Sequence, residues 1–339
     1  MYREGNKVKV LDATCRDGMH AVSHQFTPEQ IGALAKSVDG AGLAVFEVSH
    51  GDGLGGSSIN YGFGAATDKE WLEAARANLK SDTQLGILML PGIGRMEDLE
   101  MAAEAGATFA RITMHCTEAN ISKQHIQLSK RLGMTPYGVL MMAHMLQPEQ
   151  LLEQAKLLED YGAEGVYMMD SSGHMLPDDV RRRVSLLCDK LSIPVCFHAH
   201  ANLDMQVANT LAALEEGASQ VDGCLRGLGA GAGNTATEVL AAVLEMSGYD
   251  TGLDLYRLMD AAEDVLAPML KQPPIVDKAA LSIGYAGVYG SFALHAKRAA
   301  ARYGVDERDI LLECGRRKLV GGQEDMIIAI AVEMASGRN

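Results

Sequence analysis

The feature that most constrains the fold is a short signal that recurs along the chain. A helical pattern is followed by Gly-Ala or a close relative and then by a run rich in β-formers, as in "GAGLAVFEVSH" from residue 40, "EAGATFARITMHC" from 104, "YGAEGVYMMDSS" from 161 and "EGASQVDGCLRG" from 216. A glycine in the left-handed conformation can end a helix, and the next residues then lead into a strand. The signal therefore predicts helices that alternate with strands.

Four further segments complete the set of expected strands. They are "VKVLDAT" near residue 7, "LGILMLPG" near 85, "TPYGVLMMA" near 135 and "PVCFHAHA" near 194. Most are apolar without strict alternation, as expected of parallel strands that helices cover. Eight strand-then-helix units predict an α/β fold, a (β/α)8 TIM barrel over residues 1–250. A doubly wound sheet is the alternative, but it normally has fewer strands, and no GxGxxG follows the first strand.

The remainder of the chain, residues 251–339, has helical periodicity alone. "DLYRLMDAAEDVLAPML", "GSFALHAKRAAARYG" and "EDMIIAIAVEMAS" carry it. No linker rich in Pro, Gly and Ser separates this part from the barrel. We therefore expect a helical C-terminal domain that packs on the barrel.

Charge and composition exclude several classes of function. The formal charge of −14 would repel a phosphate polyanion, so nucleic acid is not an expected partner. No apolar run reaches the roughly 18 residues of a membrane span, and the N-terminal "MYREGNKVKV" has no apolar signal segment. Six scattered cysteines form no CxxC pair, which is typical of reduced thiols in the cytoplasm.

Polar residues collect at the ends of the expected strands, where the active site of a TIM barrel lies. The barrel would bring these side chains from distant parts of the chain to one mouth. The candidates are Arg16, Asp17 and His20 after the first strand, Glu47 and His50 after the second, Asp170, Ser171 and Ser172 after the sixth, His198, His200 and Asn202 at the seventh, and Asn234 after the eighth.

Two of these candidates have the spacing of metal ligands. His198 and His200 are two residues apart on a strand, so both rings point to one face. Two imidazoles and one carboxylate form a common divalent-metal set that leaves positions open for substrate, and Asp17 is the natural third ligand. The alternative is a pair of histidines that are only hydrogen-bonded in the barrel mouth.

Each other residue at the end of the first strand has a possible role beside a cation. Arg16 can stabilise a developing enolate oxygen, because its guanidinium is a permanent cation with several donors. His20 can take or give a proton near neutral pH. The structural alternatives are an ion pair of Arg16 with Glu47 or Asp12, and a surface or supporting position for His20.

Together these motifs resemble a known family. "RDGMH", "HGDGLGGSSINYGFG", "LPGIG", "DSSGH", "HAHANL", "GLGAGAGN", "GYAGVYGSF" and "GRRKLVGGQEDM" are similar to those of the 4-hydroxy-2-oxovalerate aldolases, which are metal-dependent pyruvate aldolases. The resemblance runs from the first strand to the C-terminal helices. It implies a carbon–carbon lyase that cleaves 4-hydroxy-2-oxopentanoate to pyruvate and acetaldehyde through a metal-stabilised pyruvate enolate.

The resemblance also implies roles for individual residues. Asp17, His198 and His200 match the metal ligands, with Mn²⁺ preferred and Mg²⁺ or Co²⁺ possible. Arg16 matches the enolate stabiliser and His20 the general base. Ser171 matches a contact to the substrate carboxylate, and Tyr289 a tyrosine that lines the substrate site, with Tyr285 as the competing choice.

The resemblance further implies a partner. The family's aldolases bind an acylating acetaldehyde dehydrogenase, which receives the aldehyde through a channel, and the helical domain is the usual contact region. The breakdown of aromatic hydrocarbons is one pathway in which the family acts, and the sequence does not fix the pathway.

Two other functions remain open from the residues alone. The wider barrel group includes acyl-CoA lyases and Claisen-type condensing enzymes, and Cys224 before the glycine-rich turn would be a candidate nucleophile for a lyase of that kind. A non-catalytic scaffold for a dehydrogenase is the other alternative. A complete set of ligands argues against a scaffold, which needs none of them.

Overall fold

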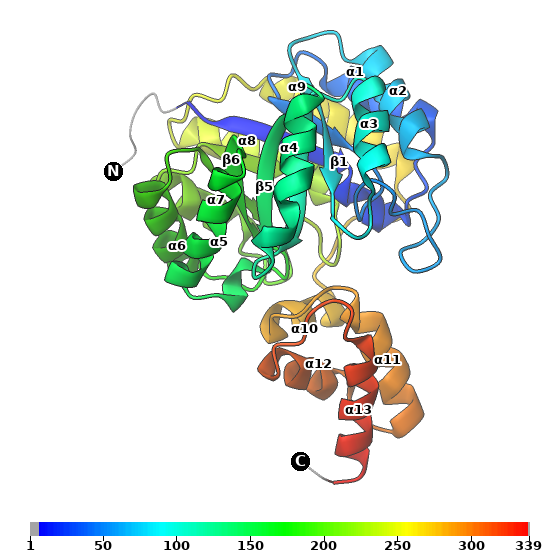
Figure 1. Cartoon of the computed structure of the whole chain (residues 1–339). Helices are drawn as coiled ribbons and strands as arrows, with labels where there is room; N and C mark the ends of the chain where they lie inside the picture. The colour runs from blue at the N-terminus through cyan, green and yellow to red at the C-terminus, as the bar shows by residue number, and fades with distance from the viewer. Residues whose placement is uncertain (1–6, 338–339) are drawn as a thin grey trace.

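The chain folds into a closed barrel of parallel strands with a helical region attached at one end (Figure 1). The computed structural model describes residues 7–337. Within these residues the barrel order is β1 to β8, which confirms the expected (β/α)8 TIM barrel and all the expected strands. The strands are β1 Lys9–Cys15, β2 Val45–Val48, β3 Gln84–Met89, β4 Phe109–His115, β5 Thr135–Met141, β6 Gly165–Asp170, β7 Val195–Ala199 and β8 Gln220–Gly223.

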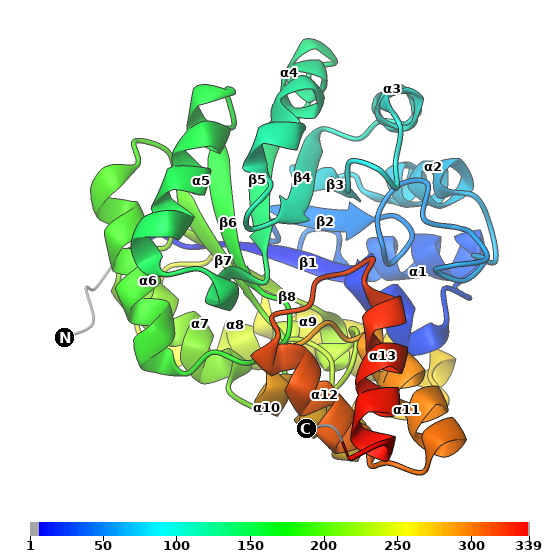
Figure 2. The same cartoon turned by 60° about the horizontal axis from the view of Figure 1, so that its bottom comes forward.

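Helices surround the barrel on its outer face, as Figures 1 and 2 show from two sides. Those that follow the strands in turn are α1 Pro28–Val38, α2 Asp68–Asn78, α3 Met96–Glu104, α4 Lys123–Arg131, α5 Pro148–Asp160, α6 Pro177–Lys190, α7 Gln206–Glu215 and α8 Thr237–Met246. Short 3-10 helices carry several loops: η1 Asp17–Val22, η2 Ala119–Ser122, η3 Ala143–Met145 and η4 Leu225–Gly227.

Local sequence explains where these helices begin and where the strands follow. Thr27 Oγ1 accepts a hydrogen bond from the Gln30 backbone, Gln30 Oε1 accepts one from the Thr27 backbone, and Pro28 follows at the first helical position. Gly106, Gly162 and Gly217 have φ between 94° and 107° and lead into β4, β6 and β8. The recurring Gly-Ala signal therefore marks a left-handed turn between helix and strand.

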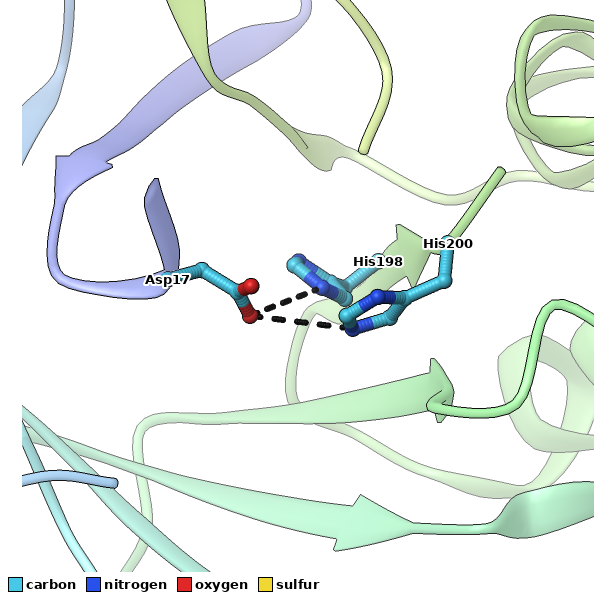
Figure 3. Close-up of side chains that lie close together, drawn as sticks. All are labelled: Asp17, His198 and His200. Carbon is cyan, nitrogen blue, oxygen red and sulfur yellow. Dashed lines mark ion pairs between the residues drawn. The ribbon is translucent and has the colours of Figure 1, made fainter. Parts of the chain in front are cut away.

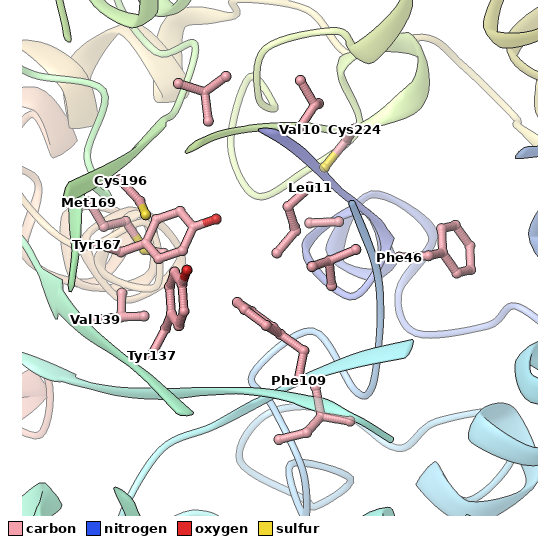
Figure 4. Packing of buried hydrophobic residues seen from close by; sticks show 14 of the residues in the cluster. Val10, Leu11, Phe46, Phe109, Tyr137, Val139, Tyr167, Met169, Cys196 and Cys224 are labelled. Atoms are coloured by element: carbon pink, nitrogen blue, oxygen red, sulfur yellow. The ribbon is translucent and has the colours of Figure 1, made fainter. Parts of the chain in front are cut away.

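The barrel closes through β1, which pairs with β2 on one side and with β8 on the other. Leu11 lies opposite Val45 in one ladder and opposite Asp222 in the other. Figure 4 shows apolar side chains such as Phe46, Phe109 and Tyr167 that pack in and around the barrel. Because every strand is hydrogen-bonded on both sides, the strand ends form one rigid ring at the mouth.

The C-terminal region forms a second, smaller hydrophobic core. Its helices are α9 Leu255–Asp260, the π-helix η5 Ala261–Leu266, η6 Ala267–Met269, α10 Lys278–Ala286, α11 Phe292–Tyr303, α12 Glu307–Arg316 and α13 Glu324–Ala335. Leu258 and Leu266 belong to the barrel core, whereas the second core runs from Ile283 to Ala331. The helical extension is thus present. Its first helices, α9 and η5, pack with the barrel, and the expected domain boundary at residue 250 stays a prediction.

The described residues also bear on membrane insertion. Across residues 7–337, every helix is too short or too polar to span a lipid bilayer.

Candidate metal centre and its cavity

A cavity of about 650 Å³ lies between the mouth of the barrel and the helical region. Its barrel side includes residues from the ends of β1 and β3 to β7, and its other wall comes from residues 272–293. The expected site residues Arg16, Asp17, His20, Ser171, His200 and Tyr289 all line it. The strand ends and the helical region therefore enclose one chamber that contains most of the candidates.

Asp17, His198 and His200 converge at the floor of this chamber (Figure 3). Asp17 Oδ2 lies 3.8 Å from His198 Nε2 and 3.6 Å from His200 Nε2. These separations are long for hydrogen bonds but suit atoms that share one cation at about 2.0–2.2 Å. All three side chains are buried.

The free lone pair of His198 supports a metal at this point. His198 Nδ1 is 2.8 Å from Asp222 Oδ2, so the ring proton lies on Nδ1 and the Nε2 lone pair faces Asp17. His198 Nε2 is buried and has no hydrogen-bond partner among the described residues. A buried acceptor without a partner is costly unless a cation or donor fills its place. The donor set of one carboxylate and two imidazoles fits a divalent ion.

Electrostatics keep Asp17 and His200 in the protonation states that bind a metal. Burial alone would raise the pKa of Asp17, but Arg16, His200 and His198 together hold it well below its ordinary value. Burial lowers the pKa of His200 to about 4, against the opposing charge of Asp17. The carboxylate is therefore ionised and the His200 imidazole neutral near pH 7.

Arg16 is fixed in place and still has a donor to offer. Its Nη1 donates to Asp17 Oδ2 at 2.7 Å, and its Nε donates to Glu47 Oε2 at 2.7 Å. The ion pair with Glu47, which the sequence left as a structural alternative, is thus present, and Asp12 instead bonds Thr14 and Thr237. The remaining nitrogen, Nη2, is buried without a partner among the described residues. Arg16 can therefore donate to an anionic oxygen in the cavity.

A chain of buried charged side chains supports the metal centre. Two of its members, Arg111 and Asp222, were not predicted from the sequence. Arg111 in β4 donates to both oxygens of Glu47 and to Asp222 Oδ2. Asp222 in turn orients His198. The signal available in the sequence was a charged residue in the middle of each apolar strand, "FARITMHC" and "SQVDGC".

His20 lies at the edge of the cavity, half-buried in η1. Its ring meets that of His24 edge-on, with centroids 5.0 Å apart. His50 stacks on the other side of His24 at 3.7 Å and does not line the cavity described above. His20 is thus placed to reach a ligand above the metal centre, and its role as base stays a prediction.

Ser171 and Tyr289 line the cavity from its two sides, Ser171 at the end of β6 and Tyr289 in the helical region. Ser171 Oγ accepts a hydrogen bond from the Met142 backbone at 3.1 Å, which leaves the hydroxyl proton free to donate. Tyr289 lines the chamber, and burial raises the pKa of its phenol above the ordinary value. Tyr285 is 69 % exposed and lies outside that lining.

Two other polar candidates, Asp170 and Asn202, hold loops together. Asp170 accepts from the backbones of His174 and Met175, which shapes the turn before α6. Asn202 links the β6 and β8 loops by bonding Ser172 O and the Ala232 backbone.

Cys224 does not have the environment of a nucleophile. It is fully buried, and burial raises the pKa of its thiol well above the ordinary value. Asn234 lies 3.4 Å from its sulfur and bonds Leu228 O at 2.9 Å. A buried, protonated thiol is inert, so the cysteine-dependent alternative gains no support.

Comparison with family models divides the chain in two. Residues 7–265 match the HMGL-like family, and residues 274–336 match the DmpG-like communication domain. The first match covers the barrel with α9 and η5, and the second covers most of α10 to α13.

Whole-chain relatives share a single description. A 4-hydroxy-2-oxovalerate aldolase of Carboxydothermus hydrogenoformans is 59 % identical over 329 residues, which cover 97 % of this chain and 98 % of that one. An enzyme of the same description from Pelotomaculum thermopropionicum is 55 % identical over 333 residues, with 98 % of each chain covered.

Solved structures agree with the fold. The carboxyl transferase domain of Rhizobium etli pyruvate carboxylase superposes with a TM-score of 0.78 at 16 % identity, covering 98 % of this chain and 61 % of that one. The HMG-CoA lyase of Bacillus subtilis gives 0.66 at 20 % identity, covering 80 % and 97 %. At such identities the likeness concerns the architecture alone.

Proposed function

This chain belongs to the 4-hydroxy-2-oxovalerate aldolase family, and from that premise we propose how its residues cleave 4-hydroxy-2-oxopentanoate to pyruvate and acetaldehyde. The observation that carries the proposal is the convergence of Asp17, His198 and His200 beside the free Arg16 nitrogen at the cavity. These groups come from distant parts of the sequence, and His198 Nε2 and Arg16 Nη2 are buried without a partner among the described residues.

Asp17, His198 and His200 would hold the divalent cation, which we propose to be Mn²⁺, with Mg²⁺ or Co²⁺ as substitutes. When bound, the cation supplies a Lewis acid beside the keto oxygen of the 2-oxo acid. The mixed oxygen and nitrogen donors support a first-row ion, and Asp222 supports it by fixing the His198 tautomer.

Arg16 stabilises the charge that develops when the carbon–carbon bond breaks. As C3–C4 cleaves, its electron pair moves toward the keto oxygen of the pyruvate half. Arg16 Nη2 can donate to that oxygen, while Glu47 and Asp17 keep the guanidinium from turning away. A preorganised donor of this kind is worth about 10²–10³ in rate.

His20 moves the proton that the cleavage requires. An imidazole nitrogen of His20 accepts the proton of the hydroxyl on C4, whose oxygen becomes the carbonyl of acetaldehyde. Ser171 donates its hydroxyl proton to the substrate carboxylate, and Tyr289 closes the wall on the aldehyde side. The lining of the cavity by these residues supports the assignment.

Substitution of His20 tests the base directly. His20→Ala should lower the cleavage rate by about 10²–10⁴ while one equivalent of metal stays bound, since His20 is not among the three ligands. The measurement is pyruvate release from 4-hydroxy-2-oxopentanoate together with metal analysis. A chelator should abolish pyruvate release by the unaltered enzyme, and added Mn²⁺ should restore it. Near-normal turnover of His20→Ala would contradict the assignment.

The DmpG-like communication domain supports a partner protein, which we propose to be an acylating acetaldehyde dehydrogenase. Exposed apolar side chains on α10 to α13, among them Leu281, Tyr285 and Leu294, support a contact surface there. The two proteins should co-purify as a complex. In that complex, less acetaldehyde should escape into solution during cleavage. Equal escape with and without the dehydrogenase would argue against the transfer.

We also propose that the enzyme works in the cytoplasm. All six cysteines have free thiols, and five of them are buried, which supports a reducing compartment.

A further inference from the structure

A second group of metal-type donors lies beside the first. His20, His24 and Asp52 each offer one ligand atom, and the three atoms lie within 4.8 Å of one another. We propose that they form a second divalent-cation site, suited to Zn²⁺, whose occupation inhibits the enzyme by engaging His20. The inhibition rests on the proposed role of His20 as base, whereas the binding of the second cation does not.

His24 is the fixed member of this second group. Its side chain is buried, and the stacked His50 ring holds it from behind at 3.7 Å. Burial lowers the pKa of His24 to about 3, so the imidazole is neutral and keeps a lone pair for a metal. The Gly51 backbone N–H donates to His24 Nδ1 at 3.4 Å, and the ring also bonds the Tyr61 backbone, so a cation would replace one of these hydrogen bonds.

His20 and Asp52 are the adjustable members. Both line the cavity and are partly exposed, the Asp52 side chain by 25 %. Gly51 allows the rings of His20 and His24 to lie close together, since a Cβ there would lie 2.8 Å from His20 Nε2 and 2.6 Å from His24 Cε1. The His20 ring has no hydrogen bond to another described residue that would hold it away.

The donor set and its spacing suit zinc. Zn²⁺ takes imidazole and carboxylate ligands at about 2.0–2.2 Å, which places tetrahedral donors about 3.4 Å apart. Since the three atoms lie within 4.8 Å of one another, they need to close by at most about 1.4 Å, which rotations of His20 and Asp52 can supply. A water molecule would complete the tetrahedron as the fourth ligand. Imidazole-rich sites bind Zn²⁺ more tightly than Mn²⁺.

Occupation of this second site would remove the base without removing the catalytic cation. A ring nitrogen that binds zinc has no lone pair for the C4 hydroxyl proton. Zinc should therefore inhibit even when the site of Asp17, His198 and His200 is filled, and the inhibition should be non-competitive with Mn²⁺.

Total metal per chain tests the binding. Protein saturated with Mn²⁺ is dialysed against Zn²⁺, and bound manganese and zinc are counted together. We expect about two ions per chain in the unaltered protein and in the control Asp82→Asn, whose exposed carboxylate lies outside the cluster. We expect about one ion in Asp52→Asn and in His20→Ala. One ion in the unaltered protein, or identical binding by Asp52→Asn and Asp82→Asn, overturns the inference.

Zinc inhibition separates the second site from displacement at the first. Each variant is compared with its own zinc-free activity at saturating Mn²⁺. The half-inhibiting zinc concentration should rise about tenfold or more in Asp52→Asn and stay unchanged in Asp82→Asn. If zinc acts only by replacing manganese, the total stays at one ion and the second site is refuted. If two ions bind but no pyruvate forms without zinc, the proposed function fails instead.

Discussion

Arg16, Glu47, Arg111 and Asp222 form a buried row of alternating charges under the metal centre. Isolated charges in such a place would cost several kcal/mol each, so each is tolerable only because its neighbours neutralise it. The row also fixes the orientation of two side chains of the site. Asp222 at one end bonds His198 Nδ1, and the guanidinium of Arg16 forms the other end. At the residue scale, the charges that orient the site are therefore the same ones that make its burial possible.

Asp12 is a buried carboxyl outside this row, and its protonation should be visible in stability. It accepts hydrogen bonds from the Thr14 backbone and from Thr237 Oγ1. Burial nevertheless raises its pKa from 3.8 to about 6. Between these values the unfolded chain has lost the proton and the folded chain retains it, so this group's contribution to stability falls as pH rises from about 4 to 6.

Asp12→Asn removes that titration. The variant's free energy of unfolding, relative to the unaltered protein, should rise by about 3 kcal/mol between pH 4 and pH 7. Urea unfolding of both proteins across this range measures the difference, and Asp82→Asn serves as the exposed control. A difference that stays flat with pH would show that Asp12 ionises normally in the fold.

At the scale of elements, the glycine-rich loop after β8 shapes the metal centre from the side. Ala230 N donates to Asp17 Oδ1 at 3.0 Å, and Ala232 N donates to Asn202 Oδ1 at 2.9 Å. The backbone of the loop thus replaces side chains as the donor to the ligand carboxylate.

Gly229 is the position in this loop where a side chain would press on the ligand Asp17. A Cβ there would lie 2.2 Å from Asn234 Nδ2 and 2.9 Å from Asp17 Oδ1. Gly229→Ala should therefore displace Asp17 and weaken metal binding by about tenfold or more, as measured by equilibrium dialysis. Gly290→Ala is the matched control, because a Cβ there has nothing within 4 Å. Equal metal affinity in the two variants would refute the steric argument.

At the scale of the whole molecule, two histidines of the barrel hold the helical region. His174 Nδ1 is 2.7 Å from Gly284 O, and His144 Nε2 is 3.2 Å from Gly287 O, both near the C-terminal end of α10. Carbonyls at a helix end lack partners within the helix, so these contacts satisfy them. The rings lie 4.8 Å apart and join the β5 and β6 loops to the outer wall of the cavity.

His174→Ala should loosen this attachment without unfolding the barrel. Loss of the bond to Gly284 should expose the link over residues 271–277 and speed its cleavage by a broad-specificity protease about five- to tenfold. The melting temperature of the barrel should change little. His295→Ala, on α11 and away from the contact, is the control. Unchanged cleavage of the link in His174→Ala would show that other contacts carry the attachment.

Much of this architecture could be predicted from local patterns. The Gly-Ala signal located four of the strands, because a left-handed glycine between helix and strand is a pattern of only a few residues. Asp17, His198 and His200 could be proposed together because parallel strands in a barrel all end at one mouth. Arg111 and Asp222 were not predicted, because the sequence shows each one only as a charged residue in an apolar strand. The partner of each lies far away in the sequence, and only the structure identifies it.

The sequence by itself determined the alternation of strands and helices, the identity of the polar residues at the strand ends and the helical character of the C-terminal region. These follow from propensity, periodicity and turn chemistry, which act over short distances. Only the tertiary structure decided that Tyr289 rather than Tyr285 faces the cavity, that α9 packs with the barrel and that His20 lies beside His24 and Asp52. Such contacts depend on which surfaces bury one another, and burial is a property of the whole packed chain.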